Sequence, residues 1–512
     1  MSKLLKLVSL TIIIVLGISN ISVYARSGDS GYEGGISSGE VEGKTTYDYK
    51  EVVFLTGQPI VFDGTLTIKK TAKQDSTTGK QTITSVYTYK LTNEEKSGTL
   101  NRVLSYNSVL TKKDNGQTIE ETSLNSKYSE VIDVDANTYT LKNYDYTKTT
   151  LTDSKPAVDY LAGNLWGRKT YEIGSDNGTV TVDITGDYYG YNQYWGSTET
   201  QVLEYMIQSE GKSGEAVDKW GGTASVSLSN SSAKQMKYVA NQPETISFEG
   251  GFVQTQYNNS VLQYSANLPE FDSKGVSTDR MLKMSDSLKI ESFPVKTRLL
   301  VPSMNRLRGH WAENDIKALY SLEVFSGDPE SFNPQDVMTR AEFADAIVLA
   351  AKEVPADTTL TTARTSRTTK SKKEEIISPF KDVAVESKYF TNINSAYKRG
   401  IISGRGNERF APDDYLTMAD TITIIIRALG LEAMAPSGAL MTSFVDDADI
   451  PSYARNHIYV AQRIGLVLGD EKGYLKPKEY LTKARAAVVI NKVINYLRDD
   501  LKKDYRERII NY

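Results

Sequence analysis

Two patterns of hydrophobic and polar residues divide the chain near residue 300. Before that point, short runs alternate apolar and polar positions with a period of two, which is typical of strands with one buried face. The clearest run places these residues on one face: Ile83, Ser85, Tyr87, Tyr89 and Leu91. After residue 300, apolar residues recur at steps of three and four, as in 341–351 and 421–429, which predicts helices.

Turn signals connect the predicted strands. Asn115-Gly116 and Asn177-Gly178 each lie between two apolar-alternating runs, and this dipeptide favours the tight turn of a hairpin. Further strands are expected at 52–55, 60–68, 139–146, 224–228 and 245–252. We therefore predict an antiparallel, all-β, sandwich-like region over residues 44–300, as one or two domains.

The beginning of the chain has the pattern of a secretory signal peptide over residues 1–25. Lys3 and Lys6 precede an apolar run at 7–18, and Val23-Tyr24-Ala25 places small residues at a cleavage site. The alternative is an uncleaved anchor, but the run is short of the roughly 20 residues that cross a bilayer. We expect a secreted protein that leaves the membrane after cleavage.

Two segments have the composition of linkers. Residues 26–43 are rich in Gly and Ser with almost no apolar side chains, which indicates a flexible leader. Residues 355–377 mix threonines with arginines and lysines. Such a run is usually a solvated linker, and the alternative is a strip that binds a polyanion.

Composition excludes several kinds of chemistry. The chain has 512 residues and no cysteine, so disulfides and thiolate sites are absent, and its only histidines, His310 and His457, lie in the helical part. A Ser-His-Asp triad upstream is thereby excluded. The formal charge of −4 would become −6 without Lys3 and Lys6, which argues against nucleic acid as a partner.

We expect no cofactor, no metal and no enzymatic activity. The run at 133–137 resembles the start of a calcium loop, but Thr138 stands where glycine is needed and Tyr144 where the bidentate glutamate is needed. A turn between strands is the better interpretation. Carboxylates are plentiful, so a glycoside hydrolase in the β region remains an alternative.

The helical part contains three matched units. The units share an isoleucine at the start of the first helix, then a glycine, a proline and, five residues after the proline, a threonine. The shared positions are Ile316, Ile393 and Ile458; Gly327, Gly404 and Gly469; Pro334, Pro412 and Pro477; Thr339, Thr417 and Thr482. We predict helix, glycine stop, extended loop and second helix in each unit.

The start of the second helix is the candidate binding feature. Thr339 and Glu342 have the spacing of a capping box. A helix start presents unpaired amides and a positive dipole end, and Arg340 at its first position could complete a pocket for a carboxylate. The alternative is that Arg340 is an ordinary solvated residue.

This pattern resembles the S-layer homology family, whose motif Thr-Arg-Ala-Glu occurs here at 339–342, with an aromatic-Ala dipeptide at Trp311. The resemblance covers about 302–501 and implies an all-α three-repeat module with threefold pseudosymmetry that binds secondary cell-wall polysaccharide, often through a pyruvylated sugar. It implies a location in the wall or surface layer of a bacterium, on the extracellular face. The expected repeats span 301–354, 378–432 and 443–501.

Only the first unit keeps the full motif, because Met418 and Lys483 replace its arginine in the others. We rank unit one first as a binding site, unit three second, and unit two as structural, with a solvated side chain as the alternative for Lys483. The predicted polymer-binding residues are Trp311, Thr339, Arg340, Glu342, Thr417, Thr482 and Lys483.

An aromatic stretch in the β region is a second candidate. It contains Tyr188, Tyr189, Tyr191, Tyr194 and Trp195. Exposed rings could stack on sugars, whereas buried rings would simply fill a sheet face.

The leading hypothesis is a non-enzymatic protein that is anchored to the wall and displays its β region. The alternatives are a displayed carbohydrate-active enzyme and a carbohydrate-binding or adhesive module, with extracellular glycans or other surface-layer proteins as partners.

Overall fold

The computed structural model describes residues 34–38, 45–74, 80–113, 115–175, 177–213, 216–240, 250–352, 360–362, 377–438 and 440–510. The predicted signal peptide lies outside these residues, as do most of the predicted leader and most of the predicted linker at 355–377. The predicted strand at 245–252 lies partly outside them.

The described N-terminal part forms one antiparallel sheet whose strands pair in chain order. The strands are β1 (Ile36–Ser37), β2 (Thr46–Val53), β3 (Ile60–Gln74), β4 (Gln81–Asn93), β5 (Gly98–Lys112), β6 (Gln117–Val134), β7 (Asn137–Ser154), β8 (Asp159–Ile173), β9 (Gly178–Asn192), β10 (Gly196–Ser213), β11 (Ala216–Val239), β12 (Gly251–Phe271) and β13 (Ser277–Glu291). β14 (Val295–Leu300) pairs with β12, and β15 (Leu360–Thr362) pairs in parallel with β3.

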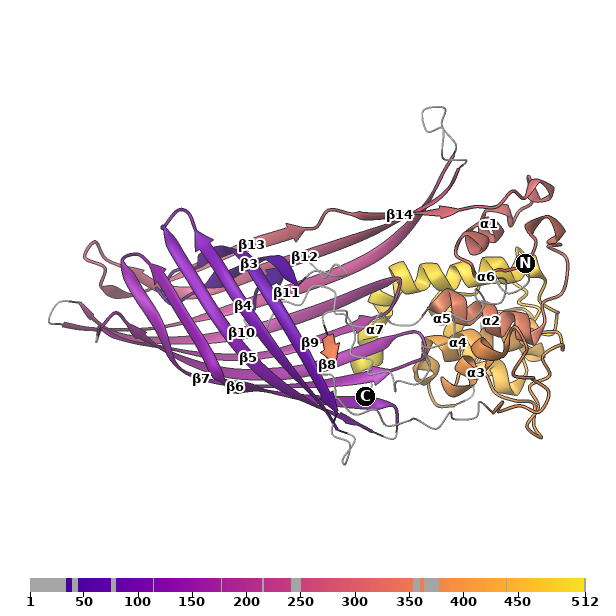
Figure 1. The fold of residues 1–512 in the computed structure, drawn as a ribbon, viewed down its shortest axis with the longest axis horizontal. Helices are drawn as coiled ribbons and strands as arrows, with labels where there is room; N and C mark the ends of the chain where they lie inside the picture. Colours follow the sequence, from indigo (N-terminus) through magenta and orange to yellow (C-terminus); the bar gives the residue numbers. More distant parts are fainter. Residues whose placement is uncertain are drawn as a thin grey trace, which may run out of the picture.

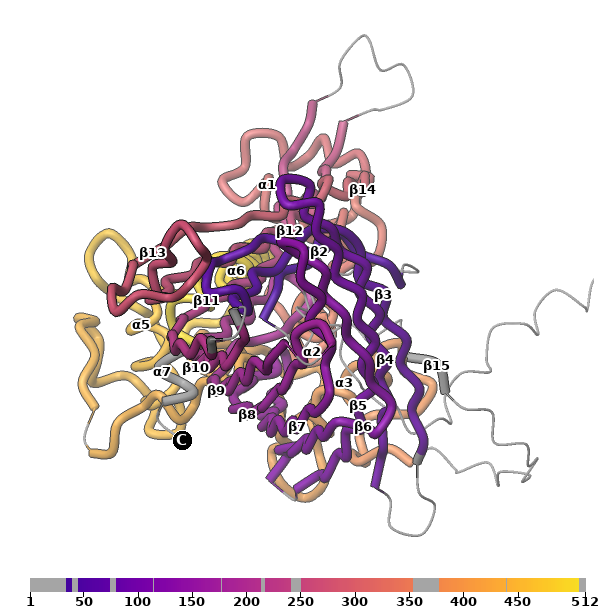
Figure 2. Tube along the Cα trace, turned by 90° about the vertical axis from the view of Figure 1, so that its left-hand side faces the viewer, coloured from indigo at the N-terminus to yellow at the C-terminus, as the bar shows by residue number. Residues whose placement is uncertain are grey.

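This sheet curls until its first and last strands are neighbours, so it is nearly closed (Figure 2). The Ser260 hydroxyl of β12 donates a hydrogen bond of 2.7 Å to the Ser37 carbonyl of β1. We call β1–β13 the rolled sheet. The predicted antiparallel all-β region is confirmed, but the predicted sandwich is wrong, because a single curled sheet encloses the core.

Local sequence signals explain the strands and turns. Tyr87, Tyr89 and Leu91 face the interior as the alternation predicted. The Asn115-Gly116 and Asn177-Gly178 turns join β5 to β6 and β8 to β9, and both glycines have positive φ. The acidic run at 133–137 is the turn between β6 and β7, as expected.

The helical part lies at one end of the rolled sheet (Figure 1). Its α-helices are α1 (Glu313–Ser321), α2 (Arg340–Ala351), α3 (Phe390–Lys398), α4 (Met418–Leu429), α5 (Arg455–Arg463), α6 (Lys483–Asn495) and α7 (Leu501–Ile510). Short helical turns are η1 (Asn305–Leu307), η2 (Pro329–Ser331), η3 (Glu432–Met434), η4 (Asp447–Asp449), η5 (Ser452–Ala454) and the π-helical η6 (Tyr496–Asp500).

The first helix of each unit ends earlier than predicted. The residue with left-handed φ is Glu323 in unit one, Gly400 in unit two and Gly465 in unit three, seven residues after the shared isoleucine. The predicted stop Gly404 lies in the following loop, where an added Cβ would be 2.9 Å from the Arg409 carbonyl oxygen. Gly404 and Gly469 thus permit close backbone approach, whereas Gly327 has nothing near its added Cβ and instead adopts a φ of 102°.

Two buried cores meet where the parts join. One fills the rolled sheet, and the other runs through the helices and includes Val158, Tyr160, Tyr191 and Trp195 from the sheet. Because these sheet residues belong to the helical core, the two parts share a packed interface rather than a free tether.

Candidate functional site

The three units form a closed ring through backbone pairing ahead of each second helix. Isolated β-bridges join Thr339 to Tyr415, Thr417 to Tyr480, and Thr482 back to Val337. Each unit therefore contacts both others through the same backbone bridges, which gives a threefold arrangement. This ring fixes the position of every second-helix start and of the contacts between units.

The amides at the helix starts are already hydrogen-bonded within the ring. In α2 the Arg340 amide donates to the Asp414 carbonyl at 2.9 Å, and the Ala341 amide donates to the Pro412 carbonyl at 3.0 Å. The same two bonds recur at α4 and α6 with the loop of the next unit. The predicted open receptor of unpaired amides is therefore not present, because the neighbouring loop occupies it.

The predicted capping box is confirmed. The Thr339 hydroxyl accepts from the Glu342 amide at 3.2 Å, and the Glu342 carboxylate accepts from the Thr339 amide at 3.0 Å. Thr417 and Asp420 repeat the arrangement at α4, and Thr482 accepts from the Arg485 amide at 3.3 Å. The three threonines thus have a structural role at the helix starts.

Arg340 links unit one to unit two. It is only 7% exposed, its Nε donates to the Phe410 carbonyl at 2.9 Å, and its guanidinium carbon lies 4.7 Å from the Phe410 ring centre. One terminal nitrogen donates to the Ser403 carbonyl at 3.2 Å. Burial, followed by the nearby Arg405, lowers the pKa of Arg340. The solvated alternative is thus wrong for Arg340.

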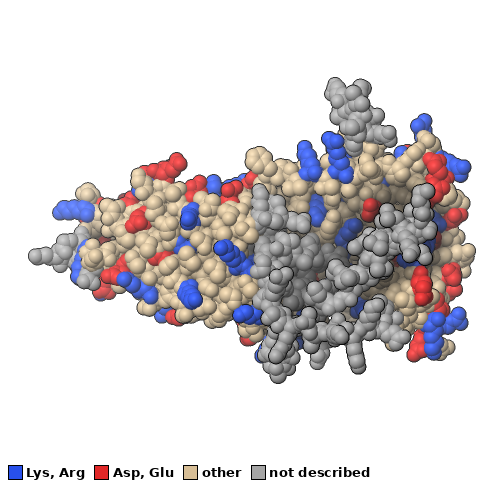
Figure 3. All heavy atoms as spheres, in the orientation of Figure 1, with Lys and Arg blue, Asp and Glu red and all other residues tan. Residues whose placement is uncertain are grey.

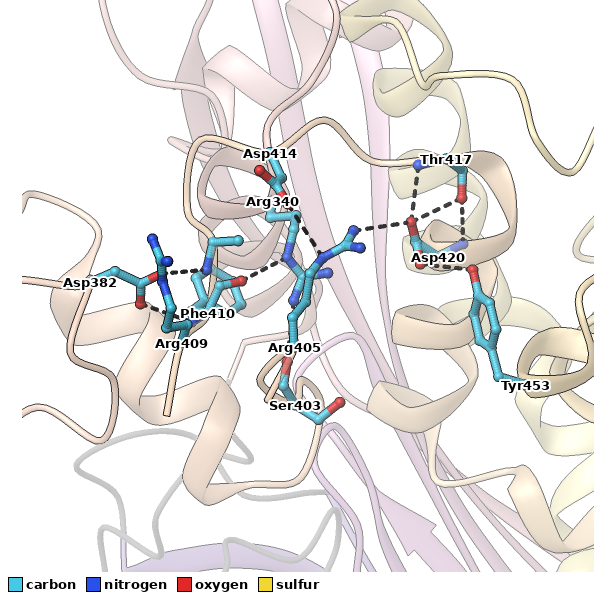
Figure 4. Close-up of polar contacts among 11 residues, drawn as sticks. Arg340, Asp382, Ser403, Arg405, Arg409, Phe410, Asp414, Thr417, Asp420 and Tyr453 are labelled. Atoms are coloured by element: carbon cyan, nitrogen blue, oxygen red, sulfur yellow. Dashed lines mark hydrogen bonds and ion pairs between the residues drawn. The ribbon is translucent and has the colours of Figure 1, made fainter. Parts of the chain in front are cut away.

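A partly exposed cation near Arg340 is one that the sequence analysis missed (Figure 4). Arg405 is 45% exposed at its side chain and lies 3.5 Å from Asp414 and 3.8 Å from Asp420. Its only signal in the sequence is position, since the other units have Asp328 and Asp470 at the equivalent place after the loop glycine.

Acidic and hydroxyl groups surround this contact between units one and two. The Tyr453 hydroxyl of unit three donates to Asp420 at 2.9 Å, and burial together with that bond raises the pKa of Tyr453 to about 12. Asp382 accepts from the Phe410 and Ala411 amides at 2.8 Å each. Burial opposes these bonds, but they outweigh it and lower the pKa of Asp382.

The other two inter-unit contacts differ from the first. Met418 takes the place of Arg340 and is 5% exposed, so that contact is apolar. Lys483 forms an ion pair of 3.1 Å with Glu342, the capping acid of unit one, and both side chains are 25% exposed. Trp311 is 64% exposed beside His310 at the start of α1.

The aromatic stretch of the rolled sheet is buried rather than displayed. Trp195 is fully buried, and its indole nitrogen donates to the Ala350 carbonyl of α2 at 2.8 Å. Tyr189 and Tyr191 pack on Tyr505 of α7, with ring centres 6.2 and 5.2 Å apart. Tyr188 is buried against Thr150, and Tyr194 packs on Trp195. These rings are packing residues, so the exposed glycan platform considered for them is not formed.

In the described part of the chain, every helix is too short or too polar to span a membrane. Within the same residues, no group of three potential metal ligands is placed to hold an ion.

Comparison with known proteins agrees with the ring. The S-layer homology domain family matches residues 307–344 and 379–421, which are in units one and two. Unit three completes the ring with the same bridges and helix-start bonds. Residues 307–344 and 379–421 are therefore S-layer homology domains, and unit three repeats their backbone contacts.

Proteins with different names contain sequences similar to this region. The exoglucanase XynX of Acetivibrio thermocellus is 29% identical over 37% of this chain and 16% of its own length. The amylopullulanase of Thermoanaerobacterium thermosulfurigenes is 30% identical over 37% of this chain and 9% of its own length. The surface-layer 125 kDa protein of Lysinibacillus sphaericus is 26% identical over 39% of this chain and 15% of its own length.

Proposed function

We propose that the helical ring anchors this protein to the bacterial cell wall without a covalent bond, by binding an acidic secondary cell-wall polysaccharide. The ring would then hold the rolled sheet outside the cell, in or near a surface layer. Relatives named as surface-layer and cell-surface proteins support this location. The observation that carries the proposal is the contact between units one and two, where Arg405 is partly exposed near the buried Arg340.

Arg405 is suited to exchange partners. Its ion pairs of 3.5 and 3.8 Å are longer than a charge-assisted hydrogen bond, so little is lost when a ligand replaces them. A carboxylate on a sugar, such as a pyruvyl group, could accept two parallel N–H hydrogen bonds from the Arg405 guanidinium. Arg340 would support this contact, since it fixes the Phe410 loop and adds positive charge close to Arg405.

The remaining predicted residues would act around this contact. Trp311 is exposed and could stack on a sugar ring. Lys483 and Glu342 would contribute at the contact between units three and one, and the capping threonines would hold the helix starts in place. Basic and acidic side chains are interspersed on the described surface in view, which favours recognition by a local groove over attraction to a broad basic patch (Figure 3).

The test is sedimentation of the full chain with purified cell walls, before and after chemical removal of the secondary polymer. We expect retention on intact walls and its loss on stripped walls. Arg405→Ala should reduce the fraction of protein retained on the walls several-fold, because the partly exposed guanidinium of Arg405 is removed. Arg280→Ala is the matched control, since that side chain is 73% exposed on the rolled sheet and is also ion-paired. Equal retention on stripped walls would contradict the proposal.

A further inference from the structure

The outer face of the rolled sheet has a hollow that the anchoring function does not use. It encloses about 500 Å³ and crosses β7, β8, β9 and β10. Trp166 lies in this hollow and is 41% exposed. By contrast, Trp195 is fully buried. A large exposed ring inside a hollow of a sheet face is a feature that points to a ligand.

The strand register extends this hollow into a track. One row across the outer face is Thr147, Trp166, Thr185, Glu204, Ser225, Ser265 and Ser285. The adjacent row is Thr149, Asn164, Asp187, Val202, Ser227, Gln263 and Ser287. A second hollow of about 470 Å³ lies on the same two rows at β11–β13.

The track is long and narrow. Strands lie about 4.8 Å apart, so seven strands give it a length of roughly 29 Å. The Arg168–Asp183 ion pair of 2.7 Å borders it on one side. On the other side, Tyr189 packs on Tyr505 of α7. Short Ser and Thr side chains between these borders leave room for an extended chain.

The lining selects the kind of chain. Asp187 and Glu204 are acidic, and none of the described residues lining the first hollow is basic, so an acidic polymer would be repelled. The carboxylates can accept hydrogen bonds from sugar hydroxyls, as Glu204 already does from Ser225 at 2.7 Å. Asn164 and the hydroxyl side chains can donate or accept, and the indole of Trp166 can stack on the apolar face of a sugar.

We propose that this track, centred on Trp166, binds an uncharged polysaccharide. The site lies on the rolled sheet. It is distinct from the contact between units one and two, where the acidic polysaccharide is proposed to bind. The protein therefore has two glycan sites of opposite charge preference, one that anchors it and one beside the anchor that holds a neutral chain.

The test is calorimetric titration of the full chain with cellohexaose, chitohexaose and hexagalacturonate. We expect at least one of the two neutral hexasaccharides to bind, and the acidic one to bind at least tenfold more weakly. Trp166→Ala should weaken binding about tenfold, and Trp166→Phe should retain most of it. Tyr257→Ala is the matched control, because Tyr257 is 39% exposed on β12 outside the track.

The two glycan proposals fail separately. Arg405→Ala should leave binding of the neutral hexasaccharide unchanged, and Trp166→Ala should leave wall retention unchanged. The track proposal is overturned if neither neutral hexasaccharide binds, if Trp166→Ala binds as well as wild type, or if hexagalacturonate binds equally well. Circular dichroism of Trp166→Ala checks that the sheet remains folded.

Discussion

Glu130 is a charged residue in the middle of the rolled sheet and has no exposed side-chain surface. Its carboxylate accepts from Arg102 at 2.7 Å, from Lys169 at 2.9 Å and from the Tyr171 hydroxyl at 3.0 Å. Arg102 also holds Glu51 through two bonds of 2.8 Å. Four strands, β2, β5, β6 and β8, are thus joined through one balanced ionic cluster, which fixes their register more specifically than apolar packing would.

Removal of this carboxylate should be strongly destabilising. In Glu130→Gln, Arg102 and Lys169 both lose one charged partner inside the core, and we expect a loss of about 3 kcal/mol in the free energy of unfolding at pH 7. Urea denaturation measures the change. The control is Glu210→Gln, whose carboxylate is 58% exposed and ion-paired on the same sheet. A comparable loss in both variants would contradict the assignment.

The same residue should give the protein a characteristic acid sensitivity. Burial alone would raise the pKa of Glu130, but Arg102 and Lys169 outweigh it and lower this pKa from 4.5 to about 2. A carboxylate with a lowered folded-state pKa stabilises the fold above its unfolded pKa, and this contribution is lost as pH falls from 4.5 towards 2. The stability difference between wild type and Glu130→Gln should therefore shrink between pH 7 and pH 3.

Helix ends show what differs among the three otherwise similar units. Glu323, Gly400 and Gly465 occupy the same left-handed position, with φ of 59°, 74° and 72°. Only the residue in unit one has a side chain, and an L-residue in this conformation costs roughly 1–2 kcal/mol. Unit one thus carries a local strain that units two and three avoid.

Exchange of residues at this position should change stability in opposite directions. Glu323→Gly should raise the free energy of unfolding by about 1 kcal/mol, because it removes the strain at an exposed site. Gly400→Ala should lower it by about the same amount. Thermal denaturation of both variants measures the effects, and a destabilised Glu323→Gly would mean that its side chain makes a compensating contact.

At the element scale, the sequence predicts the features whose signals come from residues that are neighbours in the chain. Period-two alternation, the two Asn-Gly turns and the Thr339 capping box depend on neighbours in the chain, and all were predicted correctly. The curl of the sheet depends on contacts such as Ser260 with Ser37, which are far apart in sequence. Arg405 was missed for the same reason: its neighbours Asp420 and Arg340 come from other segments of the chain.

At the scale of the whole molecule, the rolled sheet is joined to the helical part by hydrogen bonds to backbone carbonyls of the helices. Trp195 donates to Ala350, the Gln193 side chain donates to Leu497 at 2.6 Å, and the Ala157 amide donates to Ala428 at 3.0 Å. The helical ring and the rolled sheet are therefore held together by direct hydrogen bonds. Force or binding at one part should be transmitted to the other through this interface rather than through a flexible joint.

Loss of Trp195 should uncouple the two parts. Trp195→Ala leaves a cavity in the shared core and an unpaired Ala350 carbonyl, so we expect a loss of about 3–5 kcal/mol. In calorimetry, wild type should unfold in one transition because residues of the β region are part of the helical core, whereas the variant should show two. The exposed Trp166→Ala, studied without ligand, is the control for the chemical change and should keep the single transition. Two transitions already in wild type would show that the interface is too weak to couple the sheet to the ring.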